Sequence, residues 1–355
     1  MAGDLIRVRA GRQAWQQIKE QGLRQQDIEL LLGASGGPKW FILQGLDRYF
    51  FGDFFAARQR PLNTLGTSAG AWRFASLGQQ DPVAASDLFC RLYRSQTYSA
   101  KPDVAEITEE ARKLLHEYIP DAAVADILRQ DRFHHHWIVT RCRGLTAHEG
   151  KRQLLGLLGS AAANSVSRKW LGRFYERVVF HHPHATAEFS RAWRDMPTVH
   201  VPLSEQNFKP ALLATGSIPM VLAGVKDIIG APAGTYRDGG ITDYHFDVDL
   251  SAVPGLVLYP HFHQQVVPGW FDKNLGWRRT HGKQWPNVIL ITPTDEFIAS
   301  LPYGKIPDRT DFAKLSVPDR FAYWQQAVQQ GQQLAAQLQE WIESGEIRNK
   351  VALWS

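Results

Sequence analysis

The segment Gly66-Thr67-Ser68-Ala69-Gly70 constrains the fold of this chain more than any other. The largely apolar run 61–65 precedes it and Ala71 to Ala75 follow it, which predicts a strand, a sharp turn and a helix. Glycines two residues before and after a serine allow a turn tight enough to hold the hydroxyl at a helix start, where N–H groups stabilise negative charge. The segment is therefore typical of the nucleophile turn of a serine acyl hydrolase.

A second glycine-rich stretch follows another apolar strand candidate, and it reads Gly33-Ala34-Ser35-Gly36-Gly37-Pro38-Lys39-Trp40. The N–H groups of Gly36 and Gly37 can point at one substrate oxygen, and the Ala69 N–H is a third donor for such an oxyanion hole. An ordinary turn and a phosphate-binding loop are the alternatives. Trp40 stands where a P-loop has Ser or Thr, and the glycine spacing departs from the dinucleotide fingerprint. The stretch therefore favours an oxyanion hole.

A third feature, Tyr236-Arg237-Asp238-Gly239-Gly240, lies far downstream. The glycine pair, the serine turn and this Asp-Gly-Gly, in this order, resemble the patatin-like phospholipases, a family of acyl hydrolases. The resemblance is clearest over residues 28–243 and includes the run Ala211 to Pro219, a helix leading into a turn of small residues. It implies that Asp238 is the base of a dyad with Ser68, without histidine, metal or cofactor. The motif glycines are then Gly66, Gly70, Gly239 and Gly240.

The resemblance also implies a three-layer α/β fold, in which helices flank a central and mostly parallel sheet. We expect one domain over residues 1–355. Alternation of strand and helix patterns agrees with a parallel sheet covered on both faces. The predicted strands are Ile28 to Leu32, Leu62 to Gly66, Trp137 to Arg141, Val199 to Pro202, Leu256 to Tyr259 and Val288 to Ile291. The predicted helices include Arg12 to Gln21, Thr108 to Tyr118 and a packed C-terminal helix over 318–344.

Histidines offer two competing interpretations. The chain order Ser68, Asp238 and a later histidine permits the triad of an ordinary α/β-hydrolase, with His245, His261, His263 or His281 as the base. The run His134-His135-His136 and the pair His261 and His263 suggest metal ligation. However, consecutive side chains of a strand point to opposite faces, so we expect the triple histidine on a solvated strand edge and predict no metal site.

Composition restricts the partners and the compartment. The net charge is +5 without a long basic run or a nucleic-acid motif, so no nucleic-acid partner is expected, and no obligate protein partner is readable. Two cysteines and an N-terminal segment without an apolar core predict a cytoplasmic protein. Residues 262–285 mix tryptophans with Lys273, Arg278 and Arg279, which suits peripheral membrane contact or a partly packed surface loop.

Together these features predict a serine acyl hydrolase of the phospholipase A type, acting on carboxylic esters of lipids through Ser68 and Asp238. In the expected reaction Asp238 accepts a proton while Ser68 attacks the acyl carbonyl, and water later releases the acyl group. Two alternatives stay open: an esterase with a Ser-Asp-His triad, and a lipid-binding module of the same fold without turnover.

Overall fold

The computed structural model describes residues 3–185 and 188–354. The first two residues of the N-terminal segment that lacks an apolar core lie outside the described residues. The strands are β1 (Ile6–Ala10), β2 (Ile28–Gly33), β3 (Leu62–Thr67), β4 (Phe133–Cys142), β5 (Tyr175–His181), β6 (Thr198–Pro202), β7 (Val225–Lys226), β8 (Thr235–Asp238), β9 (Leu256–Pro260), β10 (Val288–Pro293) and β11 (Ala352–Leu353). The α-helices are α1 (Arg12–Gln21), α2 (Gln44–Tyr49), α3 (Ala69–Phe74), α4 (Pro82–Arg94), α5 (Val104–Tyr118), α6 (Asp121–Arg129), α7 (Gly150–Val166), α8 (Glu188–Arg191), α9 (Phe208–Thr215), α10 (Gly240–Asp243), α11 (Asp295–Ser300), α12 (Asp311–Lys314), α13 (Val317–Glu343) and α14 (Ile347–Lys350).

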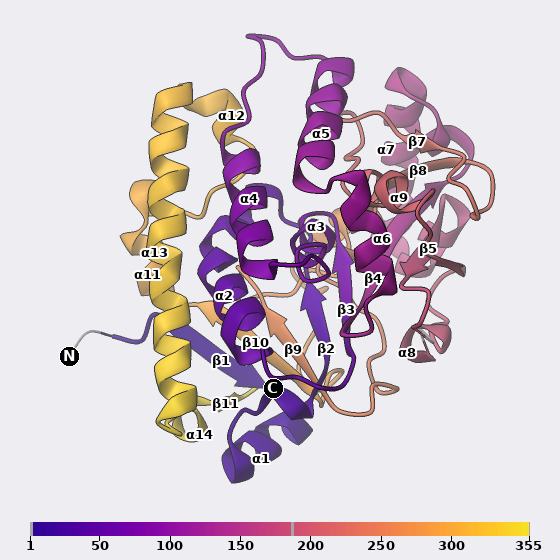
Figure 1. Cartoon of the computed structure of the whole chain (residues 1–355). Coiled ribbons are helices and arrows are strands. Elements are labelled where there is room, and N and C mark those ends of the chain that lie inside the picture. The colour runs from indigo at the N-terminus through magenta and orange to yellow at the C-terminus, as the bar shows by residue number, and fades with distance from the viewer. Residues whose placement is uncertain (1–2, 186–187, 355) are drawn as a thin grey trace.

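All the described strands join one sheet in the order β11-β1-β10-β9-β2-β3-β4-β5-β6, with β8 paired to β4 and β7 paired to β8. The neighbours from β10 through β9, β2 and β3 to β4 are parallel. Antiparallel pairing occurs between β1 and β10, between β4 and β5, and along β8. Helices flank the sheet (Figure 1), so the predicted α/β class with a mostly parallel central sheet is confirmed.

The six predicted strands are all present, and each is at least one residue longer than predicted. Five further strands of the sheet were not predicted: β1, β5, β8 and the two-residue strands β7 and β11. The strand β5 carries Glu176 and Arg177, and β8 carries Arg237 and Asp238, all of which are buried. These buried strands were not predicted because they contain charged residues, and a sequence pattern cannot show which charged side chains are paired in the folded chain.

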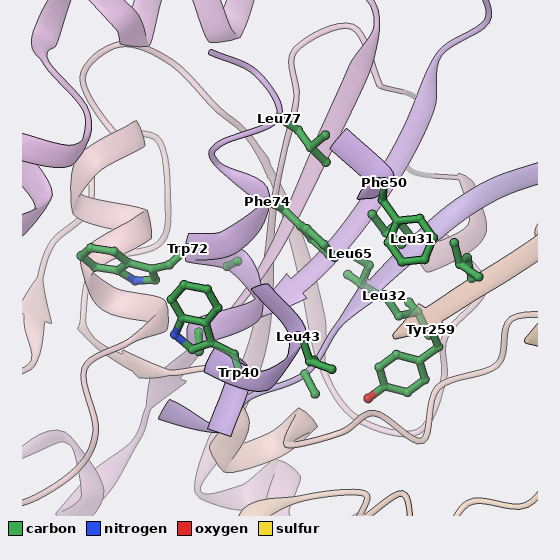
Figure 2. Close-up of a cluster of buried hydrophobic side chains, with 14 of the residues drawn as sticks. Leu31, Leu32, Trp40, Leu43, Phe50, Leu65, Trp72, Phe74, Leu77 and Tyr259 are labelled. Carbon is green, nitrogen blue, oxygen red and sulfur yellow. The ribbon is translucent and has the colours of Figure 1, made fainter. Parts of the chain in front are cut away.

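Apolar side chains from several elements enclose the turn between β3 and α3. Figure 2 shows Leu31 and Leu32 of β2, Leu65 of β3 and Phe74 of α3 together, and each is fully buried. Burying one such side chain contributes about 1.5–3 kcal/mol to the stability of the fold. The strand, turn and helix are therefore held from both sides by the core.

The C-terminal helix α13 runs from Val317 to Glu343, as predicted within one residue at each end. The Ser316 hydroxyl caps its first turn by accepting from the Asp319 N–H. Trp324, Leu334, Leu338 and other apolar residues on one face are buried, and α13 packs mainly against α2 and residues 37–43. The interpretation as a packed helix is confirmed. No helix in the described part of the chain, α13 included, is long and apolar enough to cross a membrane.

The prediction that His134 to His136 lie on a solvated edge is wrong. They belong to β4, which lies inside the sheet between β3 and β5, and all three side chains are buried. His135 exchanges a hydrogen bond with the Thr64 hydroxyl, and His136 contacts the Thr64 carbonyl. Residues 3–185 and 188–354 contain no group of three or more His, Cys, Asp or Glu side chains arranged to hold a metal ion. The histidines serve as buried, neutral core residues.

Acid is expected to weaken the fold through these buried histidines. Burial lowers the pKa of His136 and of His261 to about 3, whereas the unfolded chain titrates near its ordinary value. The unfolded state therefore takes up protons first as the pH falls below about 6.5, and stability declines from there toward the folded values. The free energy of unfolding should therefore be about 2 kcal/mol lower at pH 5 than at pH 7.5 for each of these two histidines.

Urea unfolding at the two pH values measures this loss. His136→Gln should remove about 2 kcal/mol of the pH dependence, whereas the exposed His281→Gln should leave it unchanged. Equal free energies of unfolding at pH 5 and pH 7.5 would contradict the prediction.

Candidate active site

Ser68 occupies a strained turn between β3 and α3. Its backbone has φ +52° and ψ −127°, a region that residues with a side chain rarely adopt. Such strain persists only where the surrounding structure enforces it, and it gathers at functional sites. The predicted strand, sharp turn and helix are present, with the serine at the residue that separates them.

Two glycines permit the close backbone contacts that this turn requires. A Cβ atom on Gly70 would lie 2.0 Å from the carbonyl oxygen of Gly33, at the end of β2. A Cβ atom on Gly239 would lie 2.0 Å from the carbonyl oxygen of Ile138 in β4. Any side chain at either position would therefore separate elements that must touch for the serine and the aspartate to meet.

The register of the sheet brings the two residues together. The first part of β4 pairs with β3 in parallel, up to the pair of Thr67 with Ile138. The rest of β4 pairs with β8 in the opposite direction, starting at the pair of Val139 with Asp238. The carboxyl ends of β3 and β8 therefore meet end to end along one side of β4. Ser68 and Asp238 lie at this junction.

Ser68 and Asp238 are joined by a direct hydrogen bond. The Ser68 hydroxyl donates to Oδ2 of Asp238 over 2.8 Å, and the Gly240 N–H donates to Oδ1 over 2.7 Å. Both side chains are buried. Burial raises the pKa of Asp238 to about 6, against the opposing effect of these two hydrogen bonds. The carboxylate is thus ionised at neutral pH and a stronger base than an exposed aspartate.

Thr215 and Ser217 hold the junction from the side of α9, a contribution that the sequence did not indicate. The Thr215 hydroxyl accepts from the Ser68 N–H over 3.0 Å and donates to the Ile138 carbonyl over 2.6 Å. The Asp238 N–H donates to the carbonyl of Ser217 over 3.0 Å. Both residues belong to the small-residue run 211–219, which was the only signal for them. Thr215 and Ser217 therefore help to position Ser68 and Asp238, and the sequence did not predict this role.

The candidate oxyanion donors lie on the same cavity as the serine. Gly36 and Gly37 line a cavity of about 260 Å³ together with Ser68 and Asp238, while Ala69 begins α3 directly after the serine. Gly37 has φ +54° and opens the short helix Gly37–Leu43. Within the described part of the chain, the amides of Gly36, Gly37 and Ala69 donate to no other group. These amides are therefore available to a ligand.

A second, larger cavity meets the first at the serine. It has a volume of about 440 Å³, and its walls include Trp72, Phe89, Leu114 and Leu213. Ser68, Gly37 and Ile218 line both cavities. Ser68 therefore stands between an apolar chamber and a polar one, which suits a substrate with an apolar chain on one side of the reacting bond.

Three cationic side chains line the polar cavity: Lys39, Lys273 and Arg309. Within residues 3–185 and 188–354, no acidic side chain lies within ion-pair distance of any of them. The Lys273 ammonium instead stacks on the Tyr244 ring, 4.0 Å from its centroid. Burial, and then Lys39 and Arg309, lower the pKa of Lys273 to about 7. An anion bound there would relieve the repulsion among the three groups.

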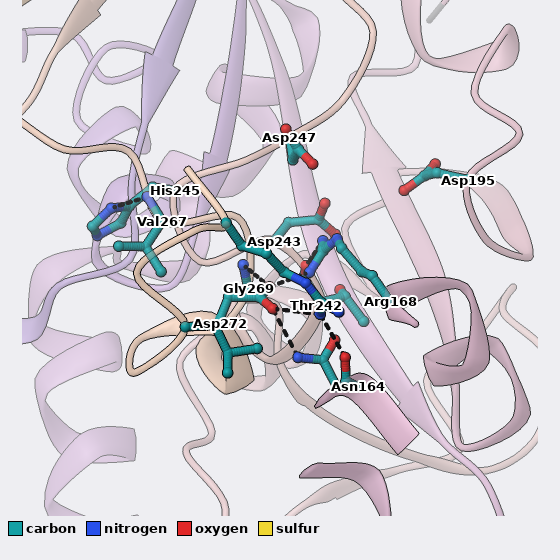
Figure 3. Close-up of polar contacts among 12 residues, drawn as sticks. Asn164, Arg168, Asp195, Thr242, Asp243, His245, Asp247, Val267, Gly269 and Asp272 are labelled. Atoms are coloured by element: carbon teal, nitrogen blue, oxygen red, sulfur yellow. Dashed lines mark hydrogen bonds and ion pairs between the residues drawn. The ribbon is translucent and has the colours of Figure 1, made fainter. Parts of the chain in front are cut away.

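None of the four histidines considered for a triad approaches the serine in the described structure. His245 accepts from the Val267 N–H over 3.1 Å (Figure 3), and its ring packs against His261. His261 contacts the His263 carbonyl, and His281 is exposed. None of them lines either cavity, and none hydrogen-bonds to Ser68 or Asp238. The only base beside Ser68 among the described residues is Asp238.

A buried ion-pair network supports the turn after Asp238. Arg177 of β5 donates to both carboxylate oxygens of Asp243 over 2.8 Å, and it also binds Asp195. The side chains of Arg177 and Asp243 are fully buried. Asp243 ends α10, which starts two residues after Asp238. Figure 3 shows Asp243 near a second buried carboxylate, Asp272.

Residues 262–285 form a partly packed surface segment. Trp285 is buried and donates to the Val248 carbonyl, whereas Trp277 is 73% exposed. The Arg278 guanidinium donates to backbone carbonyls at the end of α7, and that of Arg279 donates mostly to carbonyls within its own segment. The basic and aromatic residues of this segment are thus largely used within the molecule.

Comparison with protein-family models and with curated proteins finds no match for this chain. The function of the chain must therefore be judged from its own site. That site contains a serine on a strained turn, a buried carboxylate in hydrogen-bond contact with it, free amides beside it, and two cavities that meet at it.

Proposed function

We propose that this protein is a serine acyl hydrolase of the patatin-like type, which cleaves carboxylic esters of lipids through Ser68 and Asp238. The observation that carries the proposal is the 2.8 Å hydrogen bond from the Ser68 hydroxyl to the buried Asp238 carboxylate. A nucleophile held against a base of raised pKa is the arrangement that covalent acyl transfer requires. The order of the glycine pair, the serine turn and the Asp-Gly-Gly along the chain supports the same family.

The reaction follows from this geometry. Asp238 accepts the hydroxyl proton while Ser68 Oγ attacks the acyl carbonyl, and the resulting oxyanion is held by the amides of Gly36, Gly37 and Ala69. The carbonyl re-forms as the carbon–oxygen bond to the alcohol breaks, and Asp238 returns its proton to the departing alkoxide. Water then attacks the acyl-serine and gives a proton to Asp238. The bond between the acyl carbon and Ser68 Oγ breaks, Asp238 returns the proton to Oγ, and the carboxylic acid leaves. No other reactant is needed.

The two cavities indicate the substrate class. The apolar chamber lined by Trp72, Phe89 and Leu213 accommodates an acyl chain, because burial of its methylene groups is the main source of affinity available there. The polar chamber with Lys39, Lys273 and Arg309 then receives the alcohol portion. These three basic side chains outnumber the two carboxylates of the same lining, Asp238 and Asp308, and this favours an alcohol that carries a negative group, such as the phosphodiester of a phospholipid.

Covalent labelling tests the proposal. A fluorophosphonate probe is expected to modify one serine per chain, Ser68, with loss of fluoride, and p-nitrophenyl acyl esters should be hydrolysed. Ser68→Ala should abolish the labelling and lower kcat by about 10³-fold or more. Ser86→Ala is the matched control, because Ser86 is also buried but lies on α4 outside both cavities.

Two outcomes would contradict the proposal. Labelling that persists in Ser68→Ala would place the nucleophile elsewhere. Vesicle binding without labelling or ester turnover in the wild type, unchanged in Ser68→Ala, would identify a lipid-binding module without catalytic activity.

A further inference from the structure

The helix α7, from Gly150 to Val166, has its apolar and polar faces reversed relative to a helix of a water-soluble surface. Its inward face carries the polar residues Gln153, Ser160 and Asn164 and a single leucine, Leu157, all buried. Its outward face carries Leu154, Leu155 and Leu158, which are 47%, 60% and 59% exposed, and ends at Val166, 66% exposed. Large apolar side chains gathered on one exposed helix face mark an interaction surface.

Hydrogen bonds of the inward side chains hold α7 in this orientation. The side-chain oxygen Oε1 of Gln153 accepts from the Met220 N–H, and the Ser160 hydroxyl donates to the Tyr175 hydroxyl. Asn164 donates to the buried Asp272 over 2.7 Å, as Figure 3 shows, and Arg168 just after the helix binds the same carboxylate. Rotation of α7 to bury its leucines would break all of these contacts. The exposure of the leucines is therefore built into the fold.

The charges in and around α7 are mostly positive. Residues 143–174 contain six basic residues and one acidic residue, Glu149, an excess as large as the net charge of +5 of the whole chain. Glu149 is paired with Arg237. Lys151 and Arg152 at the start of the helix, and Lys169 and Arg173 after its end, are exposed and have no acidic partner among the described residues. Trp170, 42% exposed, lies between the last two and contacts Arg173.

The surface also adjoins the active site. Met220, the partner of Gln153, directly follows Pro219, which lines the polar cavity. Asp272, the partner of Asn164, directly precedes Lys273, which also lines that cavity. The helix is thus hydrogen-bonded to two of the loops that form the cavity wall.

We infer that the outward face of α7, extended by Trp170, docks on an anionic lipid surface. Leucines and a tryptophan would enter the interface, while Lys151, Arg152, Lys169 and Arg173 meet the headgroups. An apolar face bordered, among the described residues, by four unpaired basic side chains and a single acidic one, Glu149, is complementary to an anionic bilayer. The role of this surface in substrate delivery depends on the proposed ester hydrolysis, but the docking itself does not.

Vesicle sedimentation tests this inference with the Ser68→Ala protein, so that binding is measured without hydrolysis. The chain is expected to bind vesicles of phosphatidylglycerol and phosphatidylcholine more tightly than vesicles of phosphatidylcholine alone, and added salt should weaken the binding. Leu155→Asp with Leu158→Asp, and separately Lys151→Glu with Arg152→Glu, should each weaken it about tenfold or more. In the wild-type background both variants should retain p-nitrophenyl ester turnover, which also shows that they fold.

The comparison variant is Trp277→Asp, in the other segment with an exposed tryptophan, and it should bind as well as the unaltered chain. Undiminished vesicle binding in both α7 variants would overturn the inference. Loss of binding only in Trp277→Asp would assign the membrane contact to residues 262–285 instead. A dimer in solution that dissociates in Leu155→Asp with Leu158→Asp would show that a second copy covers this face, and would equally overturn it. If vesicles bind as expected but no ester is hydrolysed, the docking surface stands and the proposed hydrolase activity fails.

Discussion

Asp238→Asn is expected to lower kcat for ester hydrolysis by about 10³- to 10⁴-fold while leaving the fold intact. The amide has nearly the shape of the carboxylate and can still accept the Gly240 N–H, but it cannot take the proton of Ser68. The loss should therefore appear in kcat, with little change in KM. Steady-state kinetics on a p-nitrophenyl ester, together with the thermal midpoint of the variant, measure both effects.

The pH dependence of kcat/KM in the wild type is a second test of Asp238 as the base. Because burial raises the pKa of Asp238 to about 6, kcat/KM should rise as the pH increases through 6 and stay level above it. Replacement of His245, His261, His263 or His281 with glutamine should preserve turnover. Loss of turnover in one histidine variant, with Asp238→Asn still active, would replace the dyad with a triad.

Arg177→Met is expected to destabilise the protein by about 3–5 kcal/mol, since it leaves the Asp243 carboxylate buried without its partner. Burial alone would lower the pKa of Arg177, but Asp243 and Asp195 outweigh burial and raise it, so this guanidinium is charged in the fold. Urea unfolding measures the change in the free energy of unfolding. Activity at temperatures below the transition should also fall, because Asp243 closes the helix that follows the catalytic turn.

The exposed pair of Arg129 and Asp126 supplies the control. Arg129→Met removes the same side chain from an ion pair whose members are 74% and 72% exposed, and it should change the free energy by about 0.5 kcal/mol or less. The double change Arg177→Met with Asp243→Leu should recover part of the lost stability, because it removes the unpaired charge. Equal effects of Arg177→Met and Arg129→Met would show that burial of the ion pair does not matter.

Local patterns in the sequence were sufficient to predict the strand, turn and helix around Ser68, because glycine spacing and apolar runs act within a few residues. They also predicted the parallel strands that are continuous apolar runs, such as β2 and β10. The strand β8 was missed, since its buried Arg237 and Asp238 resemble a polar turn. Its pairing partner β4 lies about a hundred residues earlier, and no local pattern records that register.

The residues of the candidate site also divide into those that a local motif predicted and those that it did not. Gly36, Gly37, Ser68 and Asp238 were proposed from the motifs of a family resemblance and lie on one cavity. Arg309 was not proposed, because it reaches the site from a segment without a motif. Thr215 was not, because the small-residue run that contains it did not indicate a contact with Ser68. The triple histidine was misplaced for a related reason. A polar residue in the sequence suggests solvent, but β4 is interior and its histidines are uncharged there.

The end-to-end meeting of β3 and β8 along β4 has a consequence for when the candidate site assembles during synthesis. Ser68 and Asp238 are separated by 170 positions in the chain, and their strands never pair with each other. A growing chain that has completed β3 and β4 carries the serine but lacks its base, because the second half of β4 is still without its neighbour. Under the proposed mechanism, the nucleophile and its base therefore come together only when β8 pairs with β4, late in the synthesis of the chain.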